Sequence, residues 1–277
     1  MTHNSDCISI LQLSDLHILK ASEDKLLGIN TEYYFHACLE QAVRLRSQQA
    51  DTAKQHFDLM LLTGDLAQEP CAASYKRILT TLKAYQTPCI CLPGNHDDYG
   101  LMQQVLNDSG VSCRKQVIVA NWQLISLNSR IPGDPGGRLA PEELVFLENC
   151  LSENPNLHAL IAVHHHCLET NSRWMDSMII ENREELLALA AKYPQVKVIT
   201  TGHIHQVMDI KTANFRVLGV PSTCFQFTPE SVEFSVSDTA PGYRLIDLYA
   251  DGRVESEVMR LPEPLRELQK NTGYLDR

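Results

Sequence analysis

The sequence predicts an α/β fold in which two mixed β-sheets pack face to face, with helices on their outer surfaces. Three observations predict it. Short apolar runs typical of strands alternate with longer, helix-length stretches over roughly the first 200 residues. After residue 205 the pattern indicates strands only. Because these signals continue without a linker, we expect one domain over residues 1–261, followed by a charged and loosely attached tail over 262–277.

Apolar runs bounded by turn residues indicate the strands. In the first part of the chain they lie at 7–13, 58–62, 88–92, 116–120, 122–128, 157–163 and 196–200. The later part adds strands near 207–211, 214–219, 224–227, 231–237, 242–249 and 253–259. Asp251 and Gly252 separate the last two strands, and this dipeptide strongly favours a tight hairpin.

Longer segments between the strands are expected to form helices. They lie at 31–49, 71–85, 99–109, 141–152 and 182–192. The fourth opens with Pro141, Glu142 and Glu143, which is a favourable first turn. Proline there has no amide to lose, and the acidic side chains face the positive end of the helix dipole.

Composition limits the function and the compartment. The formal net charge is −10, which argues against a general binder of nucleic acid or anionic membrane. The nine cysteines are scattered and include no C-x-x-C motif, as expected for reduced thiols in the cytosol. Residues 2–6 are polar, unlike a signal peptide, and no apolar run approaches the roughly 18 residues of a membrane span. We therefore expect a cytoplasmic protein.

Potential metal ligands follow five of the predicted strands. In chain order they are Asp15, His17, Asp65, Asn95, His164, His203 and His205. Loops at the carboxyl ends of strands are where open α/β sheets usually bind ligands, so we expect these side chains to converge. Oxygen and imidazole donors suit iron, manganese or zinc. Two such ions about 3.5–4 Å apart can hold both the attacking and the leaving oxygen of a phosphoryl group, so the set predicts a two-metal hydrolytic site.

The individual residues have simpler interpretations when taken alone. An aspartate after a strand is often a turn former or a helix cap, and an asparagine after glycine is usually a turn residue. Asp65 follows Gly64, which permits close backbone approach, so Asp65 is the best candidate for a carboxylate that bridges two ions. Within the run of histidines at 164–166, neighbours point to opposite sides of an extended chain, so only one or two of them can face the metals.

The ordered motifs D-x-H, G-D, G-N-H-D, H-H and G-H-x-H resemble those of the calcineurin-like metallophosphoesterases. Further segments resemble the class III bacterial 3′,5′-cyclic-AMP phosphodiesterases, and they are Leu27–Thr31, Thr63–Gln68, Gly202–Gln206 and Pro221–Cys224. The resemblance extends from about residue 6 to about residue 261. It implies a four-layer α/β/β/α sandwich and hydrolysis of cyclic AMP to 5′-AMP, which ends a second-messenger signal. Cys167 departs from the pattern, because close relatives have proline there.

The resemblance also implies a role for each site residue. One ion would be held by Asp15, His17, Asp65 and His205. The other would be held by Asp65, Asn95, His164 and His203. His96 would face the phosphate and protonate the leaving oxygen, and Asp97 would orient His96. The substrate would lie against His17, Asp65, Asn95, His96, His164 and His205. Fe²⁺ is the expected metal, although Mn²⁺ and Zn²⁺ suit the same donors.

Several alternatives stay open at this point. The Gly- and Pro-rich segment 128–138 is either a surface loop or a rim of the substrate site. Trp174, Phe225 and Phe227 are either core residues or a stacking surface for adenine, and the polar stretch 171–178 is a candidate lid. The same metal site would also serve a broader phosphodiesterase acting on 2′,3′-cyclic nucleotides or glycerophosphodiesters, or a phosphomonoesterase. A non-catalytic scaffold of this fold should have lost some of the ligands.

Overall fold

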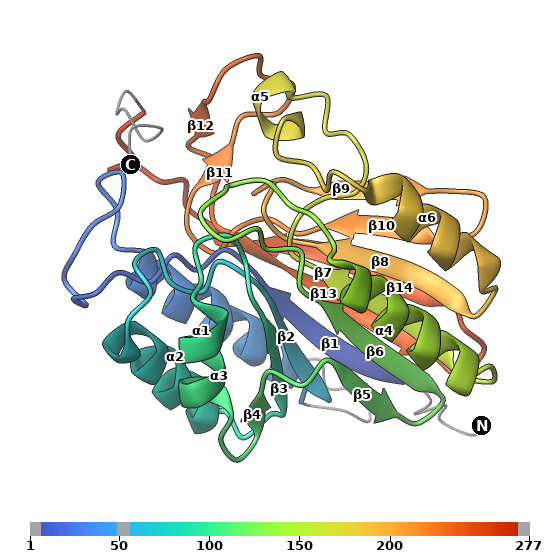
Figure 1. The fold of residues 1–277 in the computed structure, drawn as a ribbon. Coiled ribbons are helices and arrows are strands. Elements are labelled where there is room, and N and C mark those ends of the chain that lie inside the picture. The colour runs from blue at the N-terminus through green and yellow to red at the C-terminus, as the bar shows by residue number, and fades with distance from the viewer. Residues whose placement is uncertain (1–6, 49–55, 271–277) are drawn as a thin grey trace.

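Two six-stranded β-sheets form the centre of the molecule in a computed structural model that describes residues 7–48 and 56–270 (Figure 1). In spatial order the first sheet contains β14 (Val254–Arg260), β13 (Gly242–Tyr249), β1 (Cys7–Leu13), β2 (Leu59–Thr63), β3 (Cys89–Leu92) and β4 (Val111–Ser112). The second contains β5 (Gln116–Val119), β6 (Trp122–Leu127), β7 (His158–Val163), β8 (Val196–Thr201), β10 (Arg216–Gly219) and β9 (Met208–Lys211). Parallel and antiparallel pairs occur in each sheet, so both sheets are mixed as predicted.

Helices cover the outer face of each sheet, and apolar side chains fill the interfaces between the layers. The first sheet carries α1 (Thr31–Gln48), α2 (Ala72–Ala84) and α3 (Tyr99–Leu106). The second carries α4 (Pro141–Glu153) and α6 (Arg183–Lys192). A third apolar cluster joins the two sheets to each other. The order helix, sheet, sheet, helix confirms the expected four-layer sandwich.

The sequence of β1 shows how alternation assigns side chains to these layers. Ile8 and Ile10 point into the interface between the two sheets. Leu11 and Leu13 instead pack under the helices of the first sheet. Neighbouring side chains on a strand point to opposite faces, so a strand buried on both faces reads as a continuous apolar run. Burial on both faces fixes the position of the strand. It therefore also fixes where the loop that follows it begins.

The parallel strands of both sheets direct their carboxyl ends to one edge of the sandwich. They include β1, β2 and β3 in the first sheet and β7 and β8 in the second. The short helix α5 (Arg173–Asp176) and the two-stranded sheet of β11 (Gln226–Phe227) and β12 (Val236–Ser237) lie at the same end of the molecule (Figure 1). The loops at this edge carry the candidate site.

The structure differs from the sequence-based expectation in its shortest elements. Neither β4 nor α5 was expected, because two and four residues are too few to show a period. The strands expected at 224–227 and 231–237 shrink to two residues each. Residues 2–6, position 49 of the first expected helix and the end of the tail at 271–277 lie outside the described residues.

The described part of the tail is attached to the body, contrary to expectation. Leu265 is 2% exposed, and its amide donates to the carbonyl of Asp238. The amide of Gln269 donates to the carbonyl of Leu27. The tail is charged, but two of its leucines, Leu265 and Leu268, pack against the core of the second sheet. Apolar burial by two side chains therefore outweighs the polar character of the segment as a whole.

All nine cysteines are free, and seven of them are buried. This confirms the expectation of unpaired thiols that serve mostly as small core residues. Among the described residues, no helix has both the length and the apolar character needed to cross a bilayer.

Candidate metal centre

The loops after β1, β2, β3, β7 and β8 bring all seven predicted metal ligands to one place between the two sheets. One group forms around Asp15, His17 and His205. The Nε2 atom of His205 lies 3.3 Å from Asp15 Oδ1 and 3.2 Å from the Nε2 atom of His17. All three side chains are buried. Two loops of the first and second sheets thus place a carboxylate and two imidazoles within reach of one ion.

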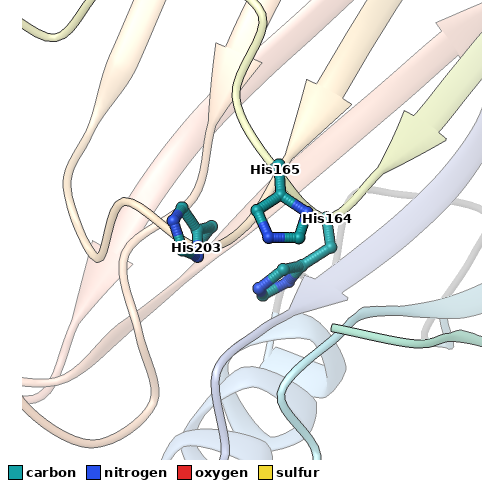
Figure 2. A group of neighbouring side chains, drawn as sticks. All are labelled: His164, His165 and His203. Carbon is teal, nitrogen blue, oxygen red and sulfur yellow. The ribbon is translucent and has the colours of Figure 1, made fainter. Parts of the chain in front are cut away.

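A second group forms around Asp65, Asn95 and His164. The Nε2 atom of His164 lies 3.4 Å from Asp65 Oδ2 and 3.1 Å from Asn95 Oδ1. The ring of His203 adjoins that of His164, at 5.1 Å between centroids (Figure 2). The same Asp65 Oδ2 atom is 3.8 Å from His17 Nε2 in the first group. Asp65 therefore stands between the two groups, where a bridging carboxylate is required.

Five of these residues have a left-handed backbone, which is uncommon for residues other than glycine. They are Asp15, His17, Asp65, His203 and His205, with φ between 44° and 64°. Local contacts hold the loops in this conformation: the amides of Asp15 and His17 donate to the carbonyls of Gly64 and Asp65. Strained backbone of this kind persists only where the surroundings fix it, and it concentrates at functional sites.

Hydrogen bonds fix the tautomer of three histidines. Nδ1 of His17 lies 2.7 Å from Gln68 Oε1, Nδ1 of His164 lies 2.7 Å from the carbonyl of Thr63, and Nδ1 of His205 lies 2.8 Å from the carbonyl of Phe225. A carbonyl oxygen only accepts, so each Nδ1 must carry a proton and donate. In the neutral rings, every Nε2 then presents a lone pair toward the carboxylates.

This donor set fits divalent cations. Lone pairs of Nε2 atoms and carboxylate oxygens that face one another at 3.2–3.4 Å repel unless a proton or a cation lies between them. His203 adds a buried Nε2 atom that has no hydrogen-bond partner among the described residues. Outward Nδ1–H bonds that orient ligand rings are typical of metal-binding histidines. The residues present therefore match the nitrogen and oxygen donors that divalent metal ions use in proteins.

The electrostatics of the site differ between its histidines. Burial lowers the pKa of His17 to about 3, so this ring is neutral. Burial also opposes charge on His164, but the adjacent Asp65 carboxylate outweighs it and raises the pKa of His164 to about 9. The histidines, led by His164, hold the pKa of Asp65 well below its usual range despite burial. In the metal-free protein, His164 thus carries the proton that balances the Asp65 carboxylate.

Two glycines allow the ligand loops to approach closely. A Cβ atom on Gly64, which has φ +93°, would lie 2.3 Å from His164 Nδ1. A Cβ atom on Gly94 would lie 2.2 Å from Asp65 Oδ1 and 2.4 Å from the Asp65 amide nitrogen. All three distances are far below contact distance, so only glycine fits at these two positions. The glycines of the G-D and G-N-H-D motifs are thus required by packing of one loop on another.

His96 lies beside the first group and is half-buried. Its amide donates to Asp65 Oδ1 at 2.9 Å, and its ring meets that of His17 edge to face at 5.1 Å. A ring nitrogen of His96 also lies within 4.8 Å of ligand atoms of His17 and Asp65. The structure therefore brings His96 to the site while leaving its ring accessible.

Asp97 has different partners from those expected. Its buried carboxylate accepts hydrogen bonds from the amides of Gly94, Leu66 and Ala67 and from the hydroxyl of Tyr75, at 2.9–3.1 Å. Within the described chain no hydrogen bond joins it to the His96 ring. Asp97 thus joins the loop after β2 to the loop after β3, and the prediction that it orients His96 is not supported.

His165 and His166 have partners outside the two groups. Nε2 of His165 lies 3.1 Å from the carbonyl of Pro135, and its Nδ1 lies 2.7 Å from Ser129 Oγ. Both ring nitrogens are therefore engaged, although the ring adjoins His164 and His203 (Figure 2). Nε2 of His166 lies 3.3 Å from Asp176 Oδ1. These contacts leave His164 as the member of the run that faces Asp65 and Asn95.

The loop 128–138 is partly exposed and partly buried. Residues 132–135 at its tip are exposed, whereas Ser129, Gly136 and Gly137 are buried. Ser129 and Pro135 contact His165, as described above. The loop is therefore anchored beside the histidine cluster, and its exposed residues are those of its tip and Arg138.

Three groups that orient histidine rings of the site were not predicted from the sequence. They are the side chain of Gln68 and the carbonyls of Thr63 and Phe225, which orient His17, His164 and His205. Gln68 lies within a segment that resembles the cyclic-AMP phosphodiesterases, and that resemblance was its only signal. Backbone carbonyls carry no signal in the sequence, because every residue has one.

Comparisons with known proteins agree with this geometry. The family model for calcineurin-like phosphoesterases matches residues 8–207. A 3′,5′-cyclic adenosine monophosphate phosphodiesterase of Escherichia coli is 38% identical over 257 residues, covering 92% of this chain and 90% of the relative. A 3′,5′-cyclic-nucleotide phosphodiesterase of Nostoc is 38% identical over 258 residues, covering 93% and 94%.

A solved structure shares the fold. The dimetal phosphatase of Danio rerio superimposes with a TM-score of 0.57 and 13% identity, over 91% of this chain and 98% of that one. At this identity the likeness concerns the fold alone. The family model and the sequence relatives, which span most of both chains, agree with the buried cluster of histidines and aspartates. This protein belongs to the calcineurin-like phosphoesterases and is a metal-dependent hydrolase of that family.

Proposed function

We propose that this protein hydrolyses 3′,5′-cyclic AMP to 5′-AMP at a centre of two divalent metal ions, and so ends a cyclic-AMP signal. The observation that carries the proposal is the position of Asp65 between two groups of buried nitrogen and oxygen donors. The substrate rests on the relatives in Escherichia coli and Nostoc, which are named for hydrolysis of 3′,5′-cyclic nucleotides.

The two ions have different ligand sets in this proposal, and the sets share Asp65. One is held by Asp15, His17, Asp65 and His205, whose facing atoms lie 3.2–3.8 Å apart. The other is held by Asp65, Asn95, His164 and His203. His165 is not a ligand, because Ser129 and Pro135 engage both of its ring nitrogens. Fe²⁺ is the metal we expect, and Mn²⁺ and Zn²⁺ suit the same donors.

The reaction replaces the bond between phosphorus and O3′ by a bond between phosphorus and a water oxygen. When bound, two divalent ions supply positive charge to the phosphoryl group and lower the pKa of a water. His96 stands at the half-buried margin of the site, with its backbone fixed by Asp65. From there it donates a proton to O3′ as the bond breaks, which a histidine does well near neutral pH.

The substrate contacts, the domain extent, the cellular location and the substrate class are proposed as the sequence predicts them. The substrate contacts His17, Asp65, Asn95, His96, His164 and His205. One catalytic domain spans residues 1–261, and the described part of the tail packs onto it. Nine free cysteines fit a reducing compartment, which supports a cytoplasmic location. The net charge of −10 supports a small-molecule substrate in preference to nucleic acid or membrane.

A panel of phosphoesters compared by kcat/KM tests the proposed substrate. The metal-loaded protein would be given 3′,5′-cyclic AMP, 3′,5′-cyclic GMP, 2′,3′-cyclic AMP, a glycerophosphodiester and p-nitrophenyl phosphate. We expect 3′,5′-cyclic AMP to rank first, with 5′-AMP as the product. A higher kcat/KM for 2′,3′-cyclic AMP or the glycerophosphodiester would identify a broader phosphodiesterase and contradict the proposal.

A further inference from the structure

Three aromatic side chains close to the site are candidates for binding a nucleotide base, and the structure separates them. Phe225 is fully buried, and its ring stacks on His17 with centroids 5.8 Å apart. Phe227 is 6% exposed, and its ring stacks on His205 at 4.2 Å. These two rings support proposed metal ligands and are covered. Trp174 alone remains half-buried.

Trp174 is one ring further from the metal centre. Its centroid lies 4.8 Å from that of Phe227, which in turn stacks on His205. The neighbouring rings of Phe227 and Phe234 meet the indole nearly at right angles, at 88° and 76°. Among residues 7–48 and 56–270, no ring is stacked parallel to the indole. A partly exposed indole that has no parallel ring partner in the described part of the chain, and that is joined through Phe227 to a proposed ligand ring, is suited to receive a flat ligand.

Hydrogen bonds hold the indole in place. Its Nε1–H donates to Ser231 Oγ at 2.8 Å, and Ser231 Oγ donates to the carbonyl of Thr228 at 2.9 Å. The amide of Ser231 donates to Ser172 Oγ at 3.3 Å. The helix that carries Trp174 is thus joined directly to the segment that connects β11 to β12. The ring needs no further ordering to bind a ligand, which reduces the entropic cost of binding.

The segment around α5 is also fixed to the metal centre itself. Asp176 Oδ1 accepts hydrogen bonds from the amide and the hydroxyl of Thr170, each at 2.8 Å, and lies 3.3 Å from His166 Nε2. The buried ring of His166 stacks on His203 at 5.7 Å and 18°. The position of Trp174 relative to the proposed ligands is therefore set by direct contacts on two sides.

We propose that the indole of Trp174 stacks on the base of the cyclic nucleotide whose phosphate binds at the metal centre. This inference rests on the proposed function and names a residue that determines its specificity. Stacking of a base on an aromatic ring favours binding of any base and requires no charge. A purine offers a larger face than a pyrimidine, so Trp174 would favour purine cyclic nucleotides over pyrimidine ones.

The test compares cyclic AMP with a substrate that lacks the base, methyl β-ribofuranoside 3,5-cyclic phosphate. Both would be measured with wild-type protein and with Trp174→Leu and Trp174→Phe. Leucine keeps an apolar side chain without a π-face, and phenylalanine keeps the face. We expect the preference for cyclic AMP over the base-free ester to fall about tenfold in Trp174→Leu, mainly through KM. Trp174→Phe should retain most of the preference, and kcat/KM for the base-free ester should change little in either variant.

Two outcomes would overturn the inference alone, and a third would contradict the proposed function. Normal turnover of cyclic AMP, with the same preference in Trp174→Leu as in wild type, would overturn the inference alone. An equal loss for both substrates would also overturn it, because it would show that Trp174 supports the site without touching the base. Wild-type protein that hydrolyses an aryl phosphodiester but neither cyclic ester would contradict the proposed function itself.

Fluorescence provides a second measurement that does not depend on the leucine variant folding. The two tryptophans are Trp122, which is fully buried, and Trp174. A slowly hydrolysed phosphorothioate analogue of cyclic AMP should quench the emission of the metal-loaded protein by stacking on Trp174. Trp174→Phe should bind the same analogue with no quenching. Unchanged quenching in Trp174→Phe would contradict the stacking.

Discussion

At the scale of single residues, the direction of each ring nitrogen decides what a histidine does. His17, His164 and His205 donate from Nδ1 to an outward acceptor and present Nε2 to the carboxylates. His165 adjoins His164 in the sequence, yet both its nitrogens are engaged elsewhere. The same residue type is therefore suited to metal binding or to anchoring a loop, according to the acceptors around it. The sequence names the residue type but not those acceptors.

His96 is expected to act on the leaving group. Replacement by alanine removes the proton donor without removing a metal ligand, so kcat for cyclic AMP should fall by about 10²–10⁴-fold while metal content stays the same. For a diester with a p-nitrophenolate leaving group, which needs no proton, the loss should be much smaller. Steady-state kinetics on both substrates with metal analysis would check this. An equal loss on both would contradict the assigned role.

The raised pKa of His164 indicates how metal binding should depend on pH. The pKa of His164 is raised to about 9 in the metal-free protein, so at neutral pH its Nε2 is protonated and must lose that proton to bind metal. Metal affinity should therefore rise with pH up to about 9 and then level off. Calorimetry in buffers of different ionisation enthalpy should detect about one proton released per protein at neutral pH. Metal binding without proton release would show that His164 is already neutral.

At the scale of elements, the site depends on loops that pack closely after strands. Long, regular elements such as β1 and α4 were predicted almost to the residue, because alternation and a proline–glutamate start are local signals. The prediction of a loosely attached tail was wrong, because burial of Leu265 depends on partners far away in the chain. The partners of Asp97 could not be foreseen for the same reason, since they are amides of a loop about 30 residues earlier.

Replacement of Gly94 by alanine tests the packing of the loops after β2 and β3. In Gly94→Ala the new Cβ would lie 2.2 Å from Asp65 Oδ1 and would displace the proposed bridging carboxylate. Activity should be lost together with metal binding. Gly100→Ala is the matched control, because its Cβ would meet Asp98 Oδ1 at an ordinary 3.5 Å, within α3. Alanine there should preserve activity and slightly stabilise the helix. Similar losses in both variants would contradict the argument.

At the scale of the whole molecule, the proposed metal centre joins the two sheets. Asp15, Asp65 and Asn95 follow strands of the first sheet, whereas His164, His203 and His205 follow strands of the second. Each proposed ion therefore takes ligands from both layers. The four-layer arrangement was predictable, because it follows from apolar patterns. The meeting of these loops was predictable only in outline, from the rule that strand carboxyl ends share one edge.

The proposed reaction is hydrolysis of cyclic AMP by two metal ions bound where the loops of the two sheets meet. The most direct measurement is 5′-AMP release from 3′,5′-cyclic AMP by protein stripped with a chelator and then reconstituted with Fe²⁺ or Mn²⁺, with Asp65→Ala alongside. We expect no release by the stripped protein, recovery on adding metal, and no recovery in Asp65→Ala. Undiminished release by the stripped protein or by Asp65→Ala, or no release of 5′-AMP with either metal, would contradict it.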